Sequence, residues 1–314
     1  MTSLITTDIS HAVSAITEGR LVAFGTETVY GLGGNACDDH AVARIFAAKG
    51  RPSFNPLISH VADIDTAFHY GTPTPLAQEL ARLFWPGPMT LIMTKPANSP
   101  VSDLATAGLD SIALRVPANQ QARHFLNACA TPLAAPSANR SGRISPTKAI
   151  HVDEELGTCQ DLAAILDFGA ATAGLESTVI DARGGHPVIL RPGSITTQHL
   201  TDHDLSPQLG RDEGIISPGQ MDSHYAPEKQ VMLNITAPKT NDIHIAFGAD
   251  DAGLSHFNLS KSADPVEAAA NLYHTLRMAD KHDGDRITIA PIPDQGLGHA
   301  INDRLRRAAA SGAS

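Results

Sequence analysis

The residues of this chain that could do chemistry gather in short polar clusters, each at the end of a segment that reads as a strand. The clusters are TETVYG (26–31), KGRP (49–52) with Asn55 and His60 after it, Ser111 with Arg115, PSAN (136–139) running on to SPT (145–147), EST (176–178) and RPG (191–193). Arginine binds phosphate or carboxylate through two parallel hydrogen bonds, and lysine adds a compact positive charge. Loops that converge over a sheet can form a cleft. Together the clusters predict a site for a phosphorylated ligand.

No cluster supplies an evident nucleophile. The sequence contains no G-x-x-x-x-G-K-[ST] phosphate loop, no G-x-S-x-G and no H-E-x-x-H, and Gly31, Gly33 and Gly34 do not form G-x-G-x-x-G. The 15 histidines are scattered without ligand spacing, so we expect each to be a surface or core residue rather than a metal ligand. Metal ligands therefore stay unknown at this point, and the site would act by positioning reactants and neutralising charge.

The charge balance argues against a general nucleic-acid binder. The chain has 23 basic and 33 acidic residues, a formal net charge of −10, and only 4% aromatic residues, whereas nucleic-acid binders are usually basic and often stack bases on aromatic side chains. One stretch differs, because residues 111–152 contain no Asp or Glu and five basic residues: Arg115, Arg123, Arg140, Arg143 and Lys148. This basic stretch indicates a place for an anionic ligand, the alternative being a chance gap on a solvated face.

Cysteine usage and hydropathy indicate the compartment. Cys37, Cys129 and Cys159 are odd in number and show no CxxC spacing, which excludes a disulfide scaffold and fits a reducing environment. The N-terminal sequence lacks the basic and apolar regions of a signal peptide, and no apolar run approaches the ~18 residues of a membrane helix. We expect a cytoplasmic protein with no membrane association.

The elements that would position the clusters alternate irregularly over the first 200 residues. Strands are expected at 21–25, 56–61, 89–94, 112–117 and within AAILDFG, STVID and PVILRPG, and helices at 8–18, 38–50, 75–84, 120–129 and 148–156. Residues 26–34 (TETVYGLGG) read as a polar loop. Because no βαβ unit repeats, we predict an α/β protein of the α+β type, with a twisted mixed sheet rather than a Rossmann fold in its first domain.

A change of pattern divides the chain near residue 230. Residues 194–230 are irregular and rich in Pro, Gly, His and Asp, which is typical of a linker or a functional loop. After them, strands and helices alternate up to the helix expected at 297–310, which predicts a small Rossmann-like α/β domain with a parallel sheet. The predicted organisation is a catalytic domain at 1–200, a linker at 201–230 and a small C-terminal domain at 231–314.

At these clusters the sequence resembles the YrdC-like family in its two-domain form. The matching motifs, in order along the chain, are TETVYGLG, KGRP-x-x-NPL-x-x-H, WPGPMT, LRVP, PSAN-x-SG-x-x-SPT, STVID, LRPG, SPGQMDSHYAP and the terminal GLGHAINDRLRRAA. The match is dense over residues 10–200, and the last two motifs extend it to the whole chain. One departure is Gly25, which stands before Thr26 where the family commonly has Pro.

The resemblance implies an enzyme that converts L-threonine, bicarbonate and ATP into L-threonylcarbamoyl-adenylate and pyrophosphate. A partner transferase complex would then move the threonylcarbamoyl group to the tRNA adenosine beside the anticodon, with weak tRNA binding as a further possibility. Mg²⁺ is expected with the ATP triphosphate. The carbamate and the mixed anhydride both hydrolyse readily, so the pocket should also exclude water.

The resemblance also implies residue roles. The catalytic set carried over from the family is Lys49, Arg51, Ser137 and Asn139. The ATP contacts are Arg51, Asn55, Ser111, Ser137, Ser145, Arg191 and Tyr225, the last of these as a lid from the linker. The L-threonine contacts are Thr28, His60, Arg115, the backbone of Ala135, and Ser177, with Arg115 on the carboxylate.

Two other functions stay open on the sequence. One is a carbamoyltransferase that forms carbamoyl-adenylate on the same fold, although such modules normally lie in longer chains with zinc-type cysteines. The other is an RNA-binding module without catalysis, which the basic stretch favours and the net charge disfavours. The role of the small C-terminal domain also stays open, one hypothesis being that it anchors the linker and keeps Tyr225 over the pocket.

Overall fold

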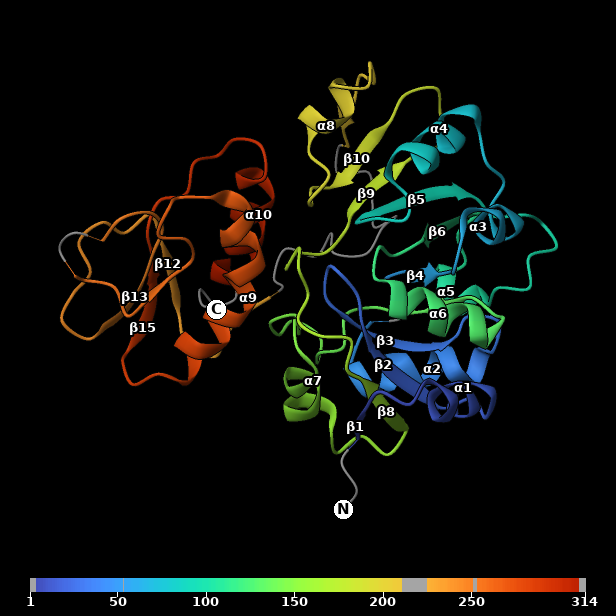
Figure 1. Ribbon diagram of the computed structural model, residues 1–314, viewed down its shortest axis with the longest axis horizontal. Coiled ribbons are helices and arrows are strands. Elements are labelled where there is room, and N and C mark those ends of the chain that lie inside the picture. Colours follow the sequence, from blue (N-terminus) through green and yellow to red (C-terminus); the bar gives the residue numbers. More distant parts are fainter. Residues whose placement is uncertain (1–3, 53, 211–224, 251–252, 311–314) are drawn as a thin grey trace.

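The computed structural model describes residues 4–52, 54–210, 225–250 and 253–310. Figure 1 shows two bodies, a larger one built on the first 200 or so residues and a smaller one formed by the C-terminal part. Residues 211–224 of the predicted linker lie outside the described residues. No described helix combines the length and the apolar character that crossing a membrane requires.

The larger body is built on one mixed sheet. In spatial order its strands are β1 (Ile5–Thr6), β8 (Leu162–Leu166), β2 (Leu21–Gly25), β3 (Tyr30–Asn35), β7 (Leu133–Ala134), β4 (Ile58–His60), β6 (Ser111–Arg115), β5 (Met89–Thr94), β9 (Thr178–Asp181), β10 (Val188–Arg191) and β11 (Gln208–Leu209). The sheet contains parallel pairs, such as β4 with β6, and antiparallel pairs, such as β5 with β6. The predicted mixed sheet is confirmed.

The helices of this body begin and end at identifiable signals. They are α1 (Ile9–Thr17), α2 (Asp39–Lys49), α3 (Ile64–Tyr70), α4 (Pro75–Phe84), α5 (Asp103–Thr106), α6 (Gln120–Cys129), α7 (Ala149–Leu156) and α8 (Thr197–Thr201). The Asp8 carboxylate accepts hydrogen bonds from two backbone N–H groups at the start of α1, as its position predicts. Gly50, at φ +59°, ends α2 immediately after Lys49.

One sequence prediction is wrong. Residues 26–34 were expected to form a loop, but the glycine-rich half of that segment is β3, which pairs antiparallel with β2. The glycine-rich sequence reads as a loop, but here the glycines allow the Phe24 ring to pack closely against the strand. A Cβ on Gly33 would lie 2.9 Å from that ring. Glycine within a strand thus allows a neighbouring group to approach the backbone closely.

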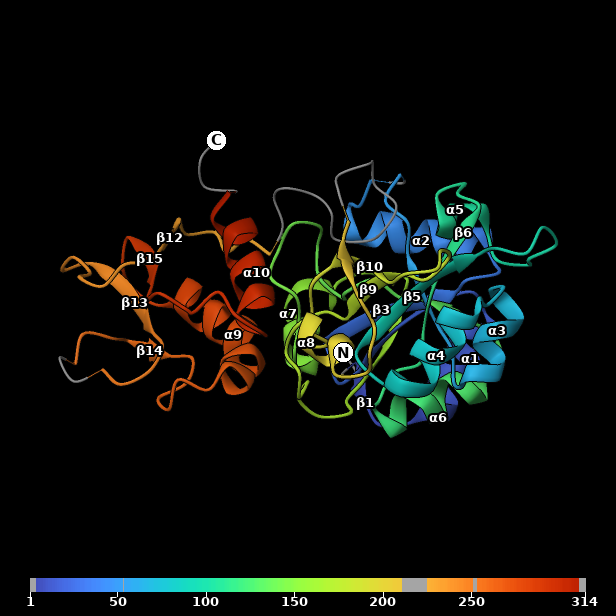
Figure 2. The same ribbon diagram turned by 90° about the horizontal axis from the view of Figure 1, so that it is seen from above.

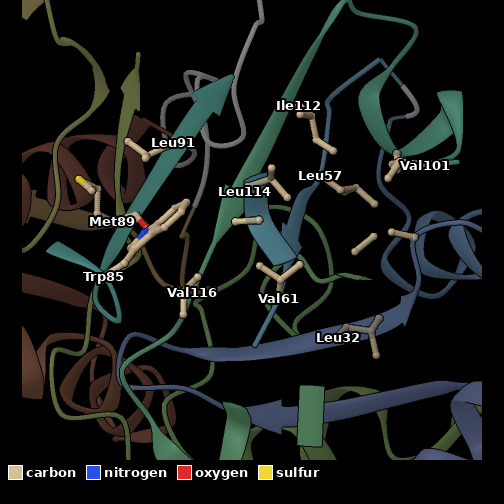
Figure 3. Close-up of a cluster of buried hydrophobic side chains, with 14 of the residues drawn as sticks. Leu32, Leu57, Val61, Trp85, Met89, Leu91, Val101, Ile112, Leu114 and Val116 are labelled. Atoms are coloured by element: carbon tan, nitrogen blue, oxygen red, sulfur yellow. The ribbon is translucent and has the colours of Figure 1, made fainter. Parts of the chain in front are cut away.

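Alternation along the strands separates a core face from a second face. Figure 3 shows Leu57, Val61, Ile112, Leu114 and Val116 among the buried apolar side chains of the largest core cluster. Successive residues of a strand point to opposite faces of a sheet. The intervening residues Ile58, His60, Ala113 and Arg115 therefore face the other side, and the β4–β6 register places His60 beside Arg115.

The smaller body is an α/β unit with a parallel sheet, as predicted. Its strands, in spatial order, are β12 (Val231–Leu233), β15 (Arg286–Ile289), β13 (Asp242–Ala246) and β14 (Phe257–Asn258), and all pair in parallel. Helices α9 (Pro265–Lys281) and α10 (Gly298–Ala310) lie between this sheet and the larger body (Figures 1 and 2). The small domain therefore meets the large one through these two helices.

Candidate functional site

A pocket of about 580 Å³, including its open mouth, lies over the face of the large sheet that carries His60 and Arg115. Its lining residues come from the strand ends and from the linker: Thr26, Thr28, Val29, Gly31, Arg51, Ile58, His60, Arg115, Ala135, Pro136, Ser137, Glu176, Ser177, Arg191 and Tyr225. The clusters singled out in the sequence thus converge on one cavity, which is a usual location for a small-ligand site.

Most of the predicted site residues line this pocket, and five do not. All five predicted threonine contacts line it (Thr28, His60, Arg115, Ala135 and Ser177), as do Arg51, Ser137, Arg191 and Tyr225. Its lining does not include Lys49, Asn55, Ser111, Asn139 or Ser145, all of which are buried. Ser111 begins β6, and Arg115 ends it, so about 13 Å of strand separates them.

Arg115 is buried and held by three acceptors. Its Nη2 lies 2.6 Å from Glu27 Oε1, its Nη1 donates to Thr28 Oγ1 at 2.8 Å, and its Nε donates to the Gly87 carbonyl at 3.4 Å. Burial raises the pKa of Glu27, but the charge and hydrogen bond of Arg115, together with backbone N–H donors such as that of Ala118, outweigh burial and the net shift is downward. Because a guanidinium has five N–H donors, further donors remain on Nη1 and Nη2 for an incoming carboxylate.

His60, next to Arg115, is a neutral imidazole at physiological pH. Burial, together with the charge of Arg115, lowers its pKa to about 3. Within the described part of the chain, its buried Nδ1 has no hydrogen-bond partner. A buried polar atom without a partner, which is uncommon in proteins, thus lies beside Arg115.

Arg191 and Ser177 also line the pocket. Arg191 Nη2 donates to the Ser177 carbonyl at 2.9 Å and to its Oγ at 3.1 Å, and that hydroxyl is 2.7 Å from Thr90 Oγ1. Arg51 donates from Nη2 to the Pro56 carbonyl at 3.1 Å. Burial lowers the pKa of Arg51 to about 10, which leaves it cationic at neutral pH. Three guanidinium groups thus face one cavity.

Lys49 acts on the loop rather than on the cavity. Its Nζ donates to the carbonyls of Ser137 at 2.6 Å and Asn139 at 2.5 Å, and the Asn139 amide donates to the carbonyls of Arg140 and Arg143, each at 2.8 Å. Burial, and then the nearby charge of Arg51, lowers the pKa of Lys49 to about 7. Lys49 and Asn139, both predicted from the resemblance, therefore fix the backbone that presents Ser137.

The lowered pKa of Lys49 makes a prediction about stability. The unfolded chain binds this proton more tightly than the folded one, so the free energy of unfolding of the native protein should rise relative to a Lys49→Met variant between pH 7 and 10. Urea unfolding of both proteins across that range measures the difference. A difference that stays constant with pH would show that the pKa of Lys49 is not lowered.

Several site residues were missed by the sequence analysis. Glu27 and Glu176 stood in clusters that were singled out, but no role was given to them. Tyr273 of α9 lies outside the matching motifs, and Arg304 of α10 lies within the terminal motif GLGHAINDRLRRAA but was given no role. Tyr273 Oη is 2.8 Å and Arg304 Nε 2.9 Å from Glu176 Oε2, so the small domain reaches a residue that lines the pocket.

Tyr225 lines the pocket from the linker and is buried between the two domains. Its ring stacks on Tyr273, with centroids 5.6 Å apart, and the Arg304 guanidinium lies 5.3 Å from its centroid. Its backbone is left-handed, at φ +67°, a conformation that costs a non-glycine residue energy and persists where surrounding contacts hold it. These contacts agree with the hypothesis that the small domain anchors the linker.

The basic stretch at 111–152 does not form one patch. Arg115 enters the pocket, whereas Arg123 donates to the carbonyls of Pro117 and Ala118. Arg143 forms an ion pair with Glu228, and Lys148 lies 3.4 Å from a His274 ring nitrogen. Only Arg115 of the five therefore lines this anion-binding pocket.

Metal-binding residues are not grouped in the part of the chain that the structure describes. No set of three or more His, Cys, Asp or Glu side chains there is arranged to hold an ion. Glu176, which lines the pocket, is committed to Ser145, Tyr273 and Arg304, and Glu27, which is outside the lining, is committed to Arg115. A cation at this site would depend on ligands brought by the substrate.

Comparison with known proteins finds matching families and named relatives over both domains of the chain. The Sua5/YciO/YrdC family profile, described as "Telomere recombination", matches residues 14–193, and the profile described as "Threonylcarbamoyl-AMP synthase, C-terminal domain" matches residues 194–310. The threonylcarbamoyl-AMP synthase of Bacillus subtilis is 39% identical over 326 residues, which cover 96% of this chain and 92% of that protein. That of Pyrococcus abyssi is 38% identical over 322 residues, covering 96% and 93%.

A solved structure agrees over the same span. The crystal structure of Pyrococcus abyssi Sua5 complexed with L-threonine superposes with a TM-score of 0.87 at 37% identity, covering 96% of this chain and 94% of that one. Both domains and the linker between them fall within the matched span. The chain therefore belongs to the two-domain Sua5/YrdC family, the family of the threonylcarbamoyl-AMP synthases, as its motifs predicted.

Proposed function

We propose that this chain is an L-threonylcarbamoyladenylate synthase, a nucleotidyltransferase that makes threonylcarbamoyl-AMP and pyrophosphate from L-threonine, bicarbonate and ATP. The observation that carries the proposal is the convergence of Arg51, Arg115 and Arg191 on one pocket that also holds the neutral His60. Such a pocket neutralises two anionic substrates and their transition state without offering a nucleophile. The named relatives support the same activity.

The reaction needs two bond-forming steps. The threonine amine attacks the carbon of bicarbonate, losing water and giving a carbamate, and a carbamate oxygen then attacks the α-phosphorus of ATP while pyrophosphate leaves. Arg115 and Thr28 hold the threonine carboxylate and hydroxyl, and His60 Nδ1 accepts a hydrogen bond from threonine. Arg51 and Arg191 bind the phosphates, and Ser137 and Ser145 contact the nucleotide, as the family resemblance implies. The chain thereby aligns the reactants and shields the carbamate from water.

Mg²⁺ enters this scheme with ATP. We propose that it is bound by phosphate oxygens and water, since Glu176, the carboxylate that lines the pocket, is already engaged by Arg304. When bound, the ion would neutralise triphosphate charge. The site of bicarbonate is expected between the threonine amine and Arg51, where an anion would meet a guanidinium.

The product would pass to a tRNA-modifying transferase complex for the adenosine beside the anticodon. We place the reaction in the cytoplasm, because the three cysteines are free thiols and tRNA modification takes place there. Direct tRNA contact by this chain would be weak, because its net charge is −10.

Pyrophosphate release from ATP tests the proposal, with threonine and bicarbonate each present or omitted. Release that requires both is the expected result. Release that needs bicarbonate but not threonine would instead point to a carbamoyl-adenylate-forming enzyme. No release in any mixture, with tight tRNA binding at low salt, would favour the RNA-binding alternative.

A further inference from the structure

A buried carboxylate joins the pocket to the small domain. Glu176 lines the pocket, is 7% exposed and accepts three hydrogen bonds. Ser145 Oγ donates to Oε1 at 2.5 Å, while Tyr273 Oη and Arg304 Nε donate to Oε2 at 2.8 and 2.9 Å. One oxygen therefore faces a residue of the large domain, and the other faces α9 and α10 of the small domain.

Arg304 is held in the same place by other contacts. It is 1% exposed, its Nη2 donates to the Pro192 carbonyl at 3.0 Å, and its Nη1 lies 2.7 Å from Asp303 Oδ2. The Pro192 contact belongs to the large domain, and the guanidinium also covers the Tyr225 ring. Its geometry is thus set by both domains and by the linker.

We propose that Arg304 of the C-terminal domain is a positioning residue of the nucleotide site, acting through Glu176 to fix the direction of the Ser145 hydroxyl. This inference rests on the proposed function, which gives Ser145 a role in binding ATP. It assigns the C-terminal domain a part in substrate binding beyond holding the linker.

The chemistry of the hydrogen bonds carries the proposal. An ionised carboxylate only accepts hydrogen bonds, so the Ser145 O–H must point to Glu176. The Ser145 oxygen then has only lone pairs to offer, so the ATP contact proposed for it would be to a donor group of the nucleotide, such as an amino or hydroxyl group. A protonated Glu176 could donate to Ser145 and reverse that preference.

Arg304 is the strongest influence that keeps Glu176 ionised. Burial raises the pKa of Glu176, but the charges of Arg304 and then Arg191, with hydrogen bonds from Ser145 and Arg304, lower it to about 2. The other titratable groups that face this carboxylate are Tyr273 on α9, Tyr225 of the linker and Lys49 on α2. Burial raises the pKa of Glu176 and the Arg304 cation lowers it. Removing that cation should therefore raise the pKa of Glu176.

The test is the pH dependence of ATP use by an Arg304→Gln variant. Relative to the native enzyme at each pH, kcat/KM for ATP should fall by about tenfold per pH unit below the raised pKa of Glu176. Arg304→Lys keeps a cation and should recover much of the loss. Arg306→Gln, an exposed position on the same helix, is the matched control and should follow the native enzyme.

A double variant separates positioning from a structural role. Glu176→Gln with Arg304→Gln contains no carboxyl to titrate, so the acid loss seen in the single variant should disappear. A ratio of Arg304→Gln to native activity that does not change with pH would overturn the proposal, and so would an acid loss that persists in the double variant.

A separate measurement distinguishes loss of folding from loss of function. Thermal unfolding of each variant at each pH shows whether the protein is folded under assay conditions. If Arg304→Gln does not fold, Tyr273→Phe removes one hydrogen bond from the same oxygen and should show a smaller acid loss; its absence would equally overturn the proposal. Native enzyme that releases no pyrophosphate would contradict the proposed function instead, whatever the variants do.

Discussion

An Arg115→Gln variant is expected to lose both threonine use and stability. The change removes a guanidinium that lies 2.6 Å from Glu27 and leaves that carboxylate buried without its cation. Breaking a buried ion pair from one side typically costs about 3–5 kcal/mol of stability, and losing a charge-assisted contact to the substrate costs a further ~2–4 kcal/mol in transition-state stabilisation. Urea unfolding and kcat/KM for threonine measure the two effects.

A double variant distinguishes the two effects of Arg115. Glu27→Gln with Arg115→Gln removes both charges, so much of the lost stability should return while threonine use stays low. This separation is expected because Glu27 faces Arg115 and the backbone N–H groups of Ala118 and Asn119, whereas Arg115 also lines the pocket. Recovery of threonine use in the double variant would show that Arg115 does not contact threonine.

An Arg51→Gln variant is expected to lose ATP use without losing the fold. Its side chain donates hydrogen bonds to the carbonyls of Asn55 and Pro56, close in sequence, rather than to a buried carboxylate. Loss of one guanidinium from the phosphate site should lower kcat/KM for ATP by about 30- to 1,000-fold. Initial rates of pyrophosphate release at varied ATP concentration provide the measurement.

The Arg51 prediction has two matched controls. Arg82→Gln removes an exposed charge on α4, outside the pocket, and should leave the rate unchanged. Arg51→Lys keeps the charge but not the planar fork that binds phosphate through two hydrogen bonds, so its rate should lie between those of the native enzyme and Arg51→Gln. Native rates from Arg51→Gln would mean that this side chain does not touch ATP.

The first domain and its pocket were accessible from sequence because their signals are local. Alternation on β4 and β6 places His60 and Arg115 on one face, and the polar clusters follow the strand ends. Strand β3 was not predicted because the polar, glycine-rich sequence of residues 26–34 reads as a loop. Only the packing of Phe24 against Gly33 shows why a strand carries these glycines.

The carboxylates and the contributions of the small domain could not be predicted in this way. An acidic residue in or near a pocket for anions is not expected from sequence until its cationic partner is known. Arg115 is that partner for Glu27. Glu176 is 97 residues from Tyr273 and 128 from Arg304, so no local pattern links them. Their meeting depends on how α9 and α10 dock against the large domain, which spacing along one sequence does not reveal.

The most direct test of the central claim is the identity of the product. Native enzyme is incubated with ATP, Mg²⁺, L-threonine and ¹³C-bicarbonate, and the nucleotides are separated at once and analysed by mass spectrometry. The account predicts one adenylate that contains threonine and a single labelled carbon, formed together with pyrophosphate. Labelled carbamoyl-adenylate without threonine, or AMP alone from the first time point, would contradict it.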